Sequence, residues 1–313
     1  MLPRVPAMLP SSRGFGALTV LRLTNSKLAI LPAEIGNLCA LEELRLDFNV
    51  LTGLPVELGN LTTLVTLGLD HNKLTSLPAE LWNLSALETL LLGFNYLGSL
   101  SAELSRLSAL KELSLTSNGL LSVPEAIRDL RSLEILCLDY NQLTSLPAWL
   151  GRLSALKKLY LAQNRLTTLP ADLGNLGALL TLNLEHNQLI NVPAELENLH
   201  ALTRLYFTYN PLLTSVPAEL GHLSALVVLG LDRDQLTSLP VEWEVNSISE
   251  TLRKCYIFSS SDEHINDLLP TPQPFRQPRW TPPLGIAFSV LGLLYAGSGL
   301  IKVIQKRVIK CQL

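Results

Sequence analysis

An asparagine recurs every 23 residues through most of the chain. The positions are Asn49, Asn72, Asn95, Asn118, Asn141, Asn164, Asn187 and Asn210. Prolines keep the same period, at Pro32, Pro55, Pro78, Pro124, Pro147, Pro170 and Pro193, and Ser101 fills the one gap. One residue is inserted after Asn210, so the next prolines are Pro217 and Pro240. A fixed period of this length indicates a stack of similar units, ten in number, which open between Leu18 and Leu226.

Each unit follows the pattern LxxLxLxxNxLxxLPxxLxxLxx. Around Leu90 the alternation predicts a short strand, because successive side chains of a strand point to opposite faces. Proline has no N–H to donate to a sheet, so Pro78 should lie outside the strand and begin the return path. Leu81 and Leu84 are three residues apart, which predicts one helical turn facing the core. A single unit cannot bury its own leucines, so the units must stack to form a shared core.

This pattern resembles the leucine-rich repeat family over roughly residues 18–245. The LPAELGNLSAL variant is similar to the short intracellular subclass found in Ras-group scaffold proteins and in many bacterial repeat proteins. The resemblance implies an α/β solenoid, a horseshoe of about ten parallel-stranded units. The ladder asparagines are interpreted as structural, because an amide has donors and acceptors for backbone groups at the bend after each strand.

The residues after the repeats have a different composition. Ser247 and Glu250 form a capping box, and Ile248, Leu252, Cys255 and Tyr256 fall on one helical face, which predicts a helix that caps the array. Six prolines lie between Pro270 and Pro283 and predict an extended linker. The predicted organisation is a partial repeat at 1–17, the array with its cap at 18–257, the linker at 258–283, a hydrophobic helix at 284–301 and a basic tail at 302–313.

The segment Leu284–Ile301 has eighteen residues and no charge, and four basic residues follow it by Lys310. A helix of that length spans about 27 Å, close to a hydrocarbon core, so we expect a transmembrane helix. Burial of this helix in the soluble domain is the alternative. Five small residues (Gly285, Ser289, Gly292, Ala296 and Gly299) share one helical stripe, which favours self-association in a membrane.

Composition excludes several classes of function. The net charge of −3 does not indicate a nucleic-acid partner. The four cysteines, Cys39, Cys137, Cys255 and Cys311, have neither metal nor disulfide spacing, which favours a reducing compartment. Common catalytic motifs are absent from the sequence, and we expect no enzymatic activity, no cofactor and no metal.

The variable positions beside the strand leucines are the candidates for recognition. Aromatic residues and histidines are concentrated there, and rigid aromatic side chains are typical interface anchors. The predicted partner-binding residues on the concave face are Phe48, His71, Phe94, Tyr140, Tyr160, His186, Tyr206 and Tyr209. Acidic residues flank them, and basic residues lie nearer the two ends of the array.

These features favour a non-enzymatic scaffold for protein–protein interaction, of the kind used in signal transduction. We expect it to lie on the cytoplasmic face of a membrane, anchored by its C-terminal helix, and to bind a protein on its concave face. A cytoplasmic soluble protein is the alternative location. The alternative function is a soluble or secreted effector-type recognition module whose apolar tail docks on a partner or self-associates.

Overall fold

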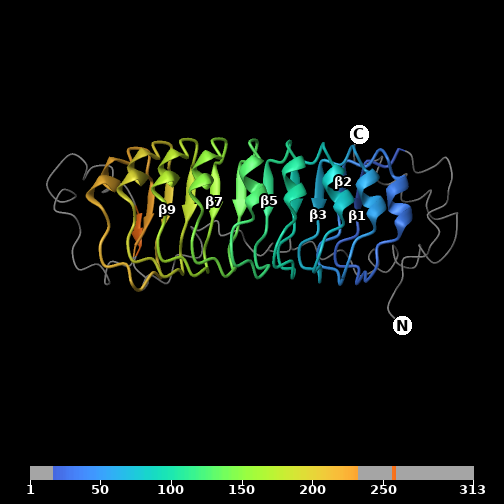
Figure 1. The fold of residues 1–313 in the computed structure, drawn as a ribbon, viewed down its shortest axis with the longest axis horizontal. Helices are drawn as coiled ribbons and strands as arrows, with labels where there is room; N and C mark the ends of the chain where they lie inside the picture. Colours follow the sequence, from blue (N-terminus) through green and yellow to red (C-terminus); the bar gives the residue numbers. More distant parts are fainter. Residues whose placement is uncertain (1–16, 232–255, 259–313) are drawn as a thin grey trace.

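The computed structural model describes residues 17–231 and 256–258 as an open, all-parallel solenoid. Its strands form one eleven-stranded sheet in sequential order from β1 to β11. Short 3-10 helices lie along the opposite side of the units (Figure 1). The predicted solenoid of parallel-stranded repeats is confirmed.

Each strand has three residues. The strands are β1 Val20–Arg22, β2 Glu43–Arg45, β3 Thr66–Gly68, β4 Thr89–Leu91, β5 Glu112–Ser114, β6 Ile135–Cys137, β7 Lys158–Tyr160, β8 Thr181–Asn183, β9 Arg204–Tyr206, β10 Val228–Gly230 and β11 Tyr256–Phe258. The register follows the repeat, since Leu67 pairs with Leu90 and Leu90 with Leu113. Equivalent side chains therefore form rows that run along the sheet.

A 3-10 helix follows each proline of the repeat within the described residues. The helices are η1 Ala33–Asn37, η2 Val56–Asn60, η3 Ala79–Asn83, η4 Ala102–Arg106, η5 Glu125–Asp129, η6 Ala148–Arg152, η7 Ala171–Asn175, η8 Ala194–Asn198 and η9 Ala218–His222. Pro78, with φ −67° and ψ 147°, is the N-cap of η3, and its carbonyl accepts the N–H of Leu81 at 3.1 Å. Ser101 has nearly the same dihedral angles, −68° and 152°, which explains why it can replace proline.

The leucines of the pattern form one continuous core. Leu81, Leu84, Leu87, Leu90 and Leu92 all have no exposed surface. The strand leucines and the helix leucines of one unit meet inside the solenoid, and each layer is covered by the next unit. This confirms the predicted inward register.

The ladder asparagines connect neighbouring units through backbone hydrogen bonds. Oδ1 of Asn141 accepts the N–H groups of Asn118 and Leu120 at 3.0 Å each, and Nδ2 donates to the carbonyls of Leu115 and Leu138, also at 3.0 Å each. The side chain is buried. Its amide groups satisfy polar backbone atoms inside an otherwise apolar core, which confirms the structural interpretation.

The C-terminal boundary differs from the prediction at one point. Tyr256, assigned to a capping helix from the sequence, lies in β11, which pairs with β10. The run Tyr-Ile-Phe has the aromatic and β-branched composition that favours a strand, and an eleventh strand extends the sheet beyond the ten units counted from the repeat. The rest of the predicted capping helix, the linker and Leu284–Ile301 lie outside the described residues. Within the described residues no helix has the length and apolar character needed to cross a membrane.

Candidate partner-binding surface

The predicted partner-binding residues occupy two rows on the strand side of the solenoid, here called the strand face. Six of them lie in the pre-asparagine row, which consists of Phe48, His71, Phe94, Ser117, Tyr140, Gln163, His186 and Tyr209. The other two, Tyr160 and Tyr206, are the last residues of β7 and β9.

Every residue of the pre-asparagine row has a left-handed backbone, with φ between 51° and 59°. The N–H of Phe94 still bonds to the carbonyl of Thr116 in the next unit, at 2.7 Å. The left-handed turn ends the strand and brings Asn95 into the core. For a residue other than glycine this conformation costs about 1–2 kcal/mol, so the network of the array holds each of these side chains in place.

Identical backbone geometry brings neighbouring rings of this row into parallel contact. Phe48 stacks on His71 with ring centroids 4.3 Å apart, and His71 stacks on Phe94 at 4.1 Å. His186 and Tyr209 form a second pair at 4.1 Å. Burial lowers the pKa of His71. The two groups of rings lie toward opposite ends of the array.

Tyr140 lies between the two groups, and 58% of its surface is exposed. Its neighbours in the row are Ser117 and Gln163, so no ring lies directly beside it. Tyr209 is also exposed, at 41%. Tyr140, Tyr209 and His186 are the exposed members of the predicted set.

Tyr160 and Tyr206 lie deeper than the sequence implied. Their exposed fractions are 9% and 3%, and the Tyr206 hydroxyl has no hydrogen-bond partner. Burial raises the pKa of Tyr160 to about 12. Side chains in this row are packed between those of adjacent strands, which are only about 4.8 Å apart. As placed, these two residues present little surface to a partner.

Four acidic residues form a carboxylate row beside the rings: Asp47, Asp70, Asp139 and Glu185. Oδ1 of Asp70 accepts the N–H of Gly93 at 2.6 Å, and Oδ1 of Asp139 accepts the N–H of Ala162 at 2.8 Å. The sequence identified these residues only as flanking charges. Their hydrogen bonds to the next unit could have been inferred from the recurrence of acids two residues before the asparagine.

Two of these carboxyl groups hold their protons unusually strongly. Burial raises the pKa of Asp70 to about 7, and the charge of Asp47 adds to the shift. Burial likewise raises the pKa of Asp139 to about 7. The nearest cation to Asp47 is Arg45, whose Nε lies 2.7 Å from Oδ2 of Asp47.

The fold agrees with that of known proteins. The leucine-rich repeat family model matches residues 39–97, 85–143 and 133–189. A leucine-rich repeat protein of Leptospira interrogans, LIC12759, is 33% identical, with 77% of this chain and 72% of that chain covered and a TM-score of 0.59. This chain is a leucine-rich repeat protein. No curated protein matches it.

A second solved structure with this leucine-rich repeat architecture is the plant peptide hormone receptor RGFR1 in complex with RGF2. It is 28% identical over 77% of this chain, with a TM-score of 0.61. The match spans only 47% of the receptor chain.

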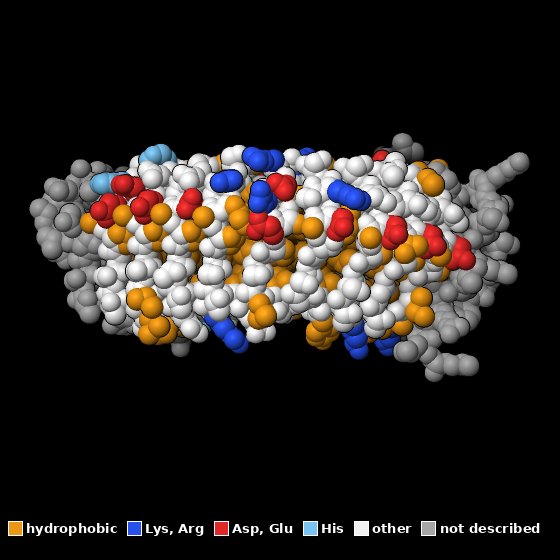
Figure 2. Space-filling view, viewed as in Figure 1, with side chains coloured by type: hydrophobic (Ala, Val, Ile, Leu, Met, Phe, Trp, Pro, Cys, Tyr) orange, Lys and Arg blue, Asp and Glu red, His pale blue; other side chains and the backbone are white. Residues whose placement is uncertain are grey.

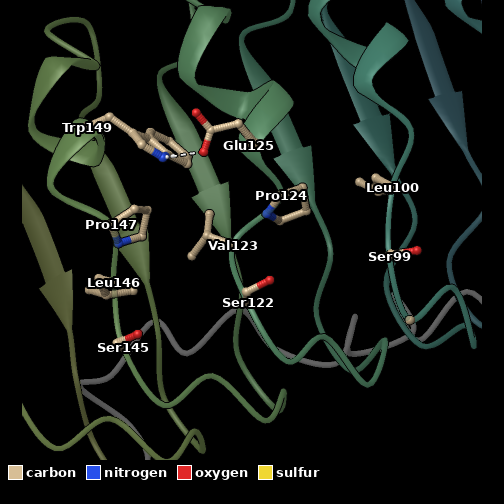
Figure 3. Close-up of a pocket in the computed structure, with 11 residues that line it drawn as sticks. Ser99, Leu100, Ser122, Val123, Pro124, Glu125, Ser145, Leu146, Pro147 and Trp149 are labelled. Atoms are coloured by element: carbon tan, nitrogen blue, oxygen red, sulfur yellow. Dashed lines mark hydrogen bonds between the residues drawn. The ribbon is translucent and has the colours of Figure 1, made fainter.

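The opposite side of the leucine-rich repeats carries a row of acidic residues. The first turn of each described 3-10 helix contains at least one, except in η6 (Figure 2). There Trp149 takes the place, and its indole N–H donates to Oε2 of Glu125 at 2.9 Å (Figure 3). A groove of about 470 Å³ lies beside Trp149 and crosses three units from Gly98 to Pro147. Trp149 was not among the residues predicted from the sequence, although it replaces the acidic residue found at this place in most other units.

The described residues contain no group of three or more histidine, cysteine or acidic side chains that could hold a metal ion. Cys137 is buried in β6, and burial raises the pKa of its thiol well above the ordinary value. The thiolate form that acts as a nucleophile is therefore disfavoured at this position.

Proposed function

We propose that this protein is a non-enzymatic scaffold that binds a protein partner on its strand face, the face predicted to be concave. The observation that carries the proposal is the pre-asparagine row, in which aromatic side chains are held by a left-handed backbone and by ring contacts. Aromatic groups held in one conformation lose little entropy on binding, so they are effective interface anchors.

An extended protein surface fits this row better than a small molecule does. Phe48 and Tyr209 are seven units apart, which at about 4.8 Å per strand is roughly 34 Å. Small-molecule ligands are typically enclosed by pockets of about 300–1,000 Å³, whereas these anchors are distributed along an open face. The RGFR1–RGF2 complex supports the proposal, because that leucine-rich repeat receptor has a peptide partner.

Site-specific photo-crosslinking tests the choice of face. A photoreactive amino acid is introduced into the full chain at Gln163, within the pre-asparagine row, and separately at Glu80 in η3. Adducts with a protein from Gln163 and none from Glu80 are expected. Adducts from Glu80 alone would move the interface to the side of the 3-10 helices.

We further propose that Leu284–Ile301 tethers the protein to a membrane and leaves the repeats on the cytoplasmic side. The support is the run of eighteen uncharged residues with a basic tail after it. The small-residue stripe that contains Gly292 and Ala296 would let two such helices associate. Carbonate-resistant membrane pelleting of the full chain, lost in a chain that ends at Pro283, is the expected result. Equal extraction of both chains would contradict the tether.

A further inference from the structure

The turns that follow the strands form one long edge of the solenoid, here called the turn edge (Figure 1). Each turn runs from the ladder asparagine, or Ser26 in the first unit, to the proline position before the 3-10 helix. The nine described turns, from Ser26 to Pro217, contain no aspartate or glutamate and three basic residues: Lys27, Lys73 and Arg165. Over the whole chain acidic residues outnumber basic ones, 27 to 24, so the turn edge is a local exception.

The three basic side chains of the turn edge are exposed. None of them forms an ion pair within 4.0 Å in the described part of the chain. Two lysines that precede strands do pair, since Lys111 binds Glu88 and Lys157 binds Glu134. In the space-filling view the acidic side chains follow the 3-10 helices, whereas the lower edge shows basic and hydrophobic side chains (Figure 2). The turn edge therefore has a positive local charge that no acidic neighbour neutralises.

Large hydrophobic side chains are exposed between these charges. Tyr96 and Leu121 lie in turns between those of Lys73 and Arg165, with 67% and 68% of their surface exposed. Three other turns each contain a hydrophobic residue that is more than half exposed: Ile30, Ile190 and Leu212. Basic and apolar side chains that are exposed together, without acidic ones, have the chemistry of a surface that lies on anionic lipid.

Backbone hydrogen bonds hold these side chains in a line. The N–H of Lys73 donates to the carbonyl of Leu51 in the preceding unit at 2.8 Å, and the N–H groups of Tyr96 and Arg165 make the equivalent bond, also at 2.8 Å. Side chains that follow the ladder asparagine therefore recur at the spacing of the strands, which places Lys27 and Arg165 roughly 29 Å apart. Because these N–H groups have partners within the protein, a contact that removes water does not leave them unsatisfied.

A line of this kind fits a flat anionic surface better than it fits a protein or a nucleic acid. Protein interfaces concentrate their anchor side chains in one packed centre, whereas these hydrophobic residues occur singly along the edge. Nucleic-acid binding depends on many phosphate contacts, and three cations are few over this length. A lipid surface needs no complementary shape, and lysine, arginine and tyrosine place apolar atoms against it while their polar ends stay in water.

We infer that the turn edge rests on the surface of a membrane that contains anionic lipid. Lys27, Lys73 and Arg165 contact the anionic headgroups, and Tyr96 and Leu121 lie against the interfacial region between them. The contact is separate from the tether proposed for Leu284–Ile301, because a single helix attaches the chain to a membrane without fixing the orientation of the repeats. The turn edge fixes that orientation.

An environment-sensitive fluorescent amino acid in the full chain tests the contact. It is introduced at Gln188 on the turn edge and, in a separate chain, at Thr62 between η2 and β3 on the opposite edge; both positions are exposed. With vesicles of phosphatidylcholine and phosphatidylserine, emission from Gln188 should shift to shorter wavelength and emission from Thr62 should not. Vesicles of phosphatidylcholine alone should give a smaller shift at Gln188, and added salt should reduce the shift.

Substitutions identify the residues that make the contact. Reversal of the edge charges, Lys27→Glu with Lys73→Glu and Arg165→Glu, should reduce the shift at Gln188 at least fivefold. Tyr96→Ser with Leu121→Ser should reduce it at least twofold. The matched control reverses three exposed arginines near the ends of 3-10 helices and should leave the shift within twofold: Arg106→Glu, Arg131→Glu and Arg152→Glu. Unfolding curves confirm that each variant is folded.

The absence of a shift at Gln188 with anionic vesicles, or equal shifts at Gln188 and Thr62, would overturn the inference. A shift that the charge-reversed edge retains in full would overturn it as well. Carbonate extraction of the same samples separates this contact from the tether. A shift at Gln188 in protein that carbonate releases supports the turn edge without the tether, and carbonate-resistant protein without the shift leaves the tail as the membrane contact and contradicts the turn edge.

Discussion

At the scale of single residues, the strand face contains residues with an unfavourable backbone conformation and carboxyl groups in an unfavourable, buried environment. The pre-asparagine row is left-handed without glycine, and the carboxylate row includes two acids with pKa values near 7. Strain and desolvation of this kind persist only where the surrounding structure compensates. Here the shared leucine core and the asparagine ladder provide that stability. The costs can be measured one residue at a time.

The left-handed backbone at Tyr140 predicts that a glycine variant is more stable than an alanine variant, which is the reverse of the usual order. Both substitutions remove the ring, but alanine keeps the steric cost at φ 56° and glycine does not. Tyr140→Gly should be more stable than Tyr140→Ala by about 0.5–1 kcal/mol in denaturant unfolding. Ala148→Gly in η6, outside the left-handed residues, is the control and should be destabilising. A less stable glycine variant at 140 would contradict the assigned conformation.

The raised pKa of Asp139 predicts that the stability of the protein depends on pH. Its pKa is about 7 in the folded protein and about 3.9 when unfolded. Between pH 4 and 7 the unfolded chain releases this proton first, so the free energy of unfolding falls as pH rises and levels off above pH 7. The free energy of unfolding of Asp139→Asn, relative to that of wild type, should therefore rise by on the order of 2–4 kcal/mol between pH 4 and pH 8.

The measurement is urea unfolding at several pH values. Glu80→Gln, an exposed substitution in η3, should change stability by less than about 0.5 kcal/mol. A difference between Asp139→Asn and wild type that does not vary with pH would show that Asp139 is ionised in the folded protein as readily as in the unfolded chain.

At the scale of elements, the strand and the 3-10 helix of each unit could be predicted from the sequence. Leucine spacing fixes which side chains point inward, and proline fixes where the return segment begins. The burial of Tyr160 and Tyr206 could not be predicted, because it depends on the size of side chains in the adjacent strands. The hydrogen bond from the N–H of Gly93 to Asp70 also involves the neighbouring unit, but the recurrence of acids two residues before the asparagine indicates it.

The register of the strands gives a direct stability prediction. Leu136 in β6 has no exposed surface, so Leu136→Ala should cost about 2–5 kcal/mol through lost burial and a cavity. Leu121 is 68% exposed, and Leu121→Ala should change stability by no more than about 0.5 kcal/mol. Thermal unfolding of both variants is the measurement. Similar effects at the two positions would contradict the inward register.

At the scale of the whole molecule, the repeat explains both the order of the sheet and the continuity of its surface rows. Each unit packs on its sequence neighbours, so a 23-residue period is sufficient to predict sequential parallel strands. The eleventh strand was missed because Tyr256–Phe258 follows a segment that breaks the repeat. Which face binds a partner is harder to predict from the repeat, because both the aromatic row and the groove beside Trp149 consist of residues that differ from unit to unit.

Binding of a protein partner on the strand face is tested most directly by comparing the proteins captured from a cell extract by three full-length chains. These are wild type, Phe94→Ala with Tyr140→Ala on the strand face, and Trp149→Ala on the side of the 3-10 helices. Unfolding curves confirm that all three are folded, and mass spectrometry quantifies the captured proteins. A partner that binds wild type and Trp149→Ala equally, and binds the strand-face variant at least tenfold less, is predicted. A partner that the strand-face variant retains in full and Trp149→Ala loses would contradict the account.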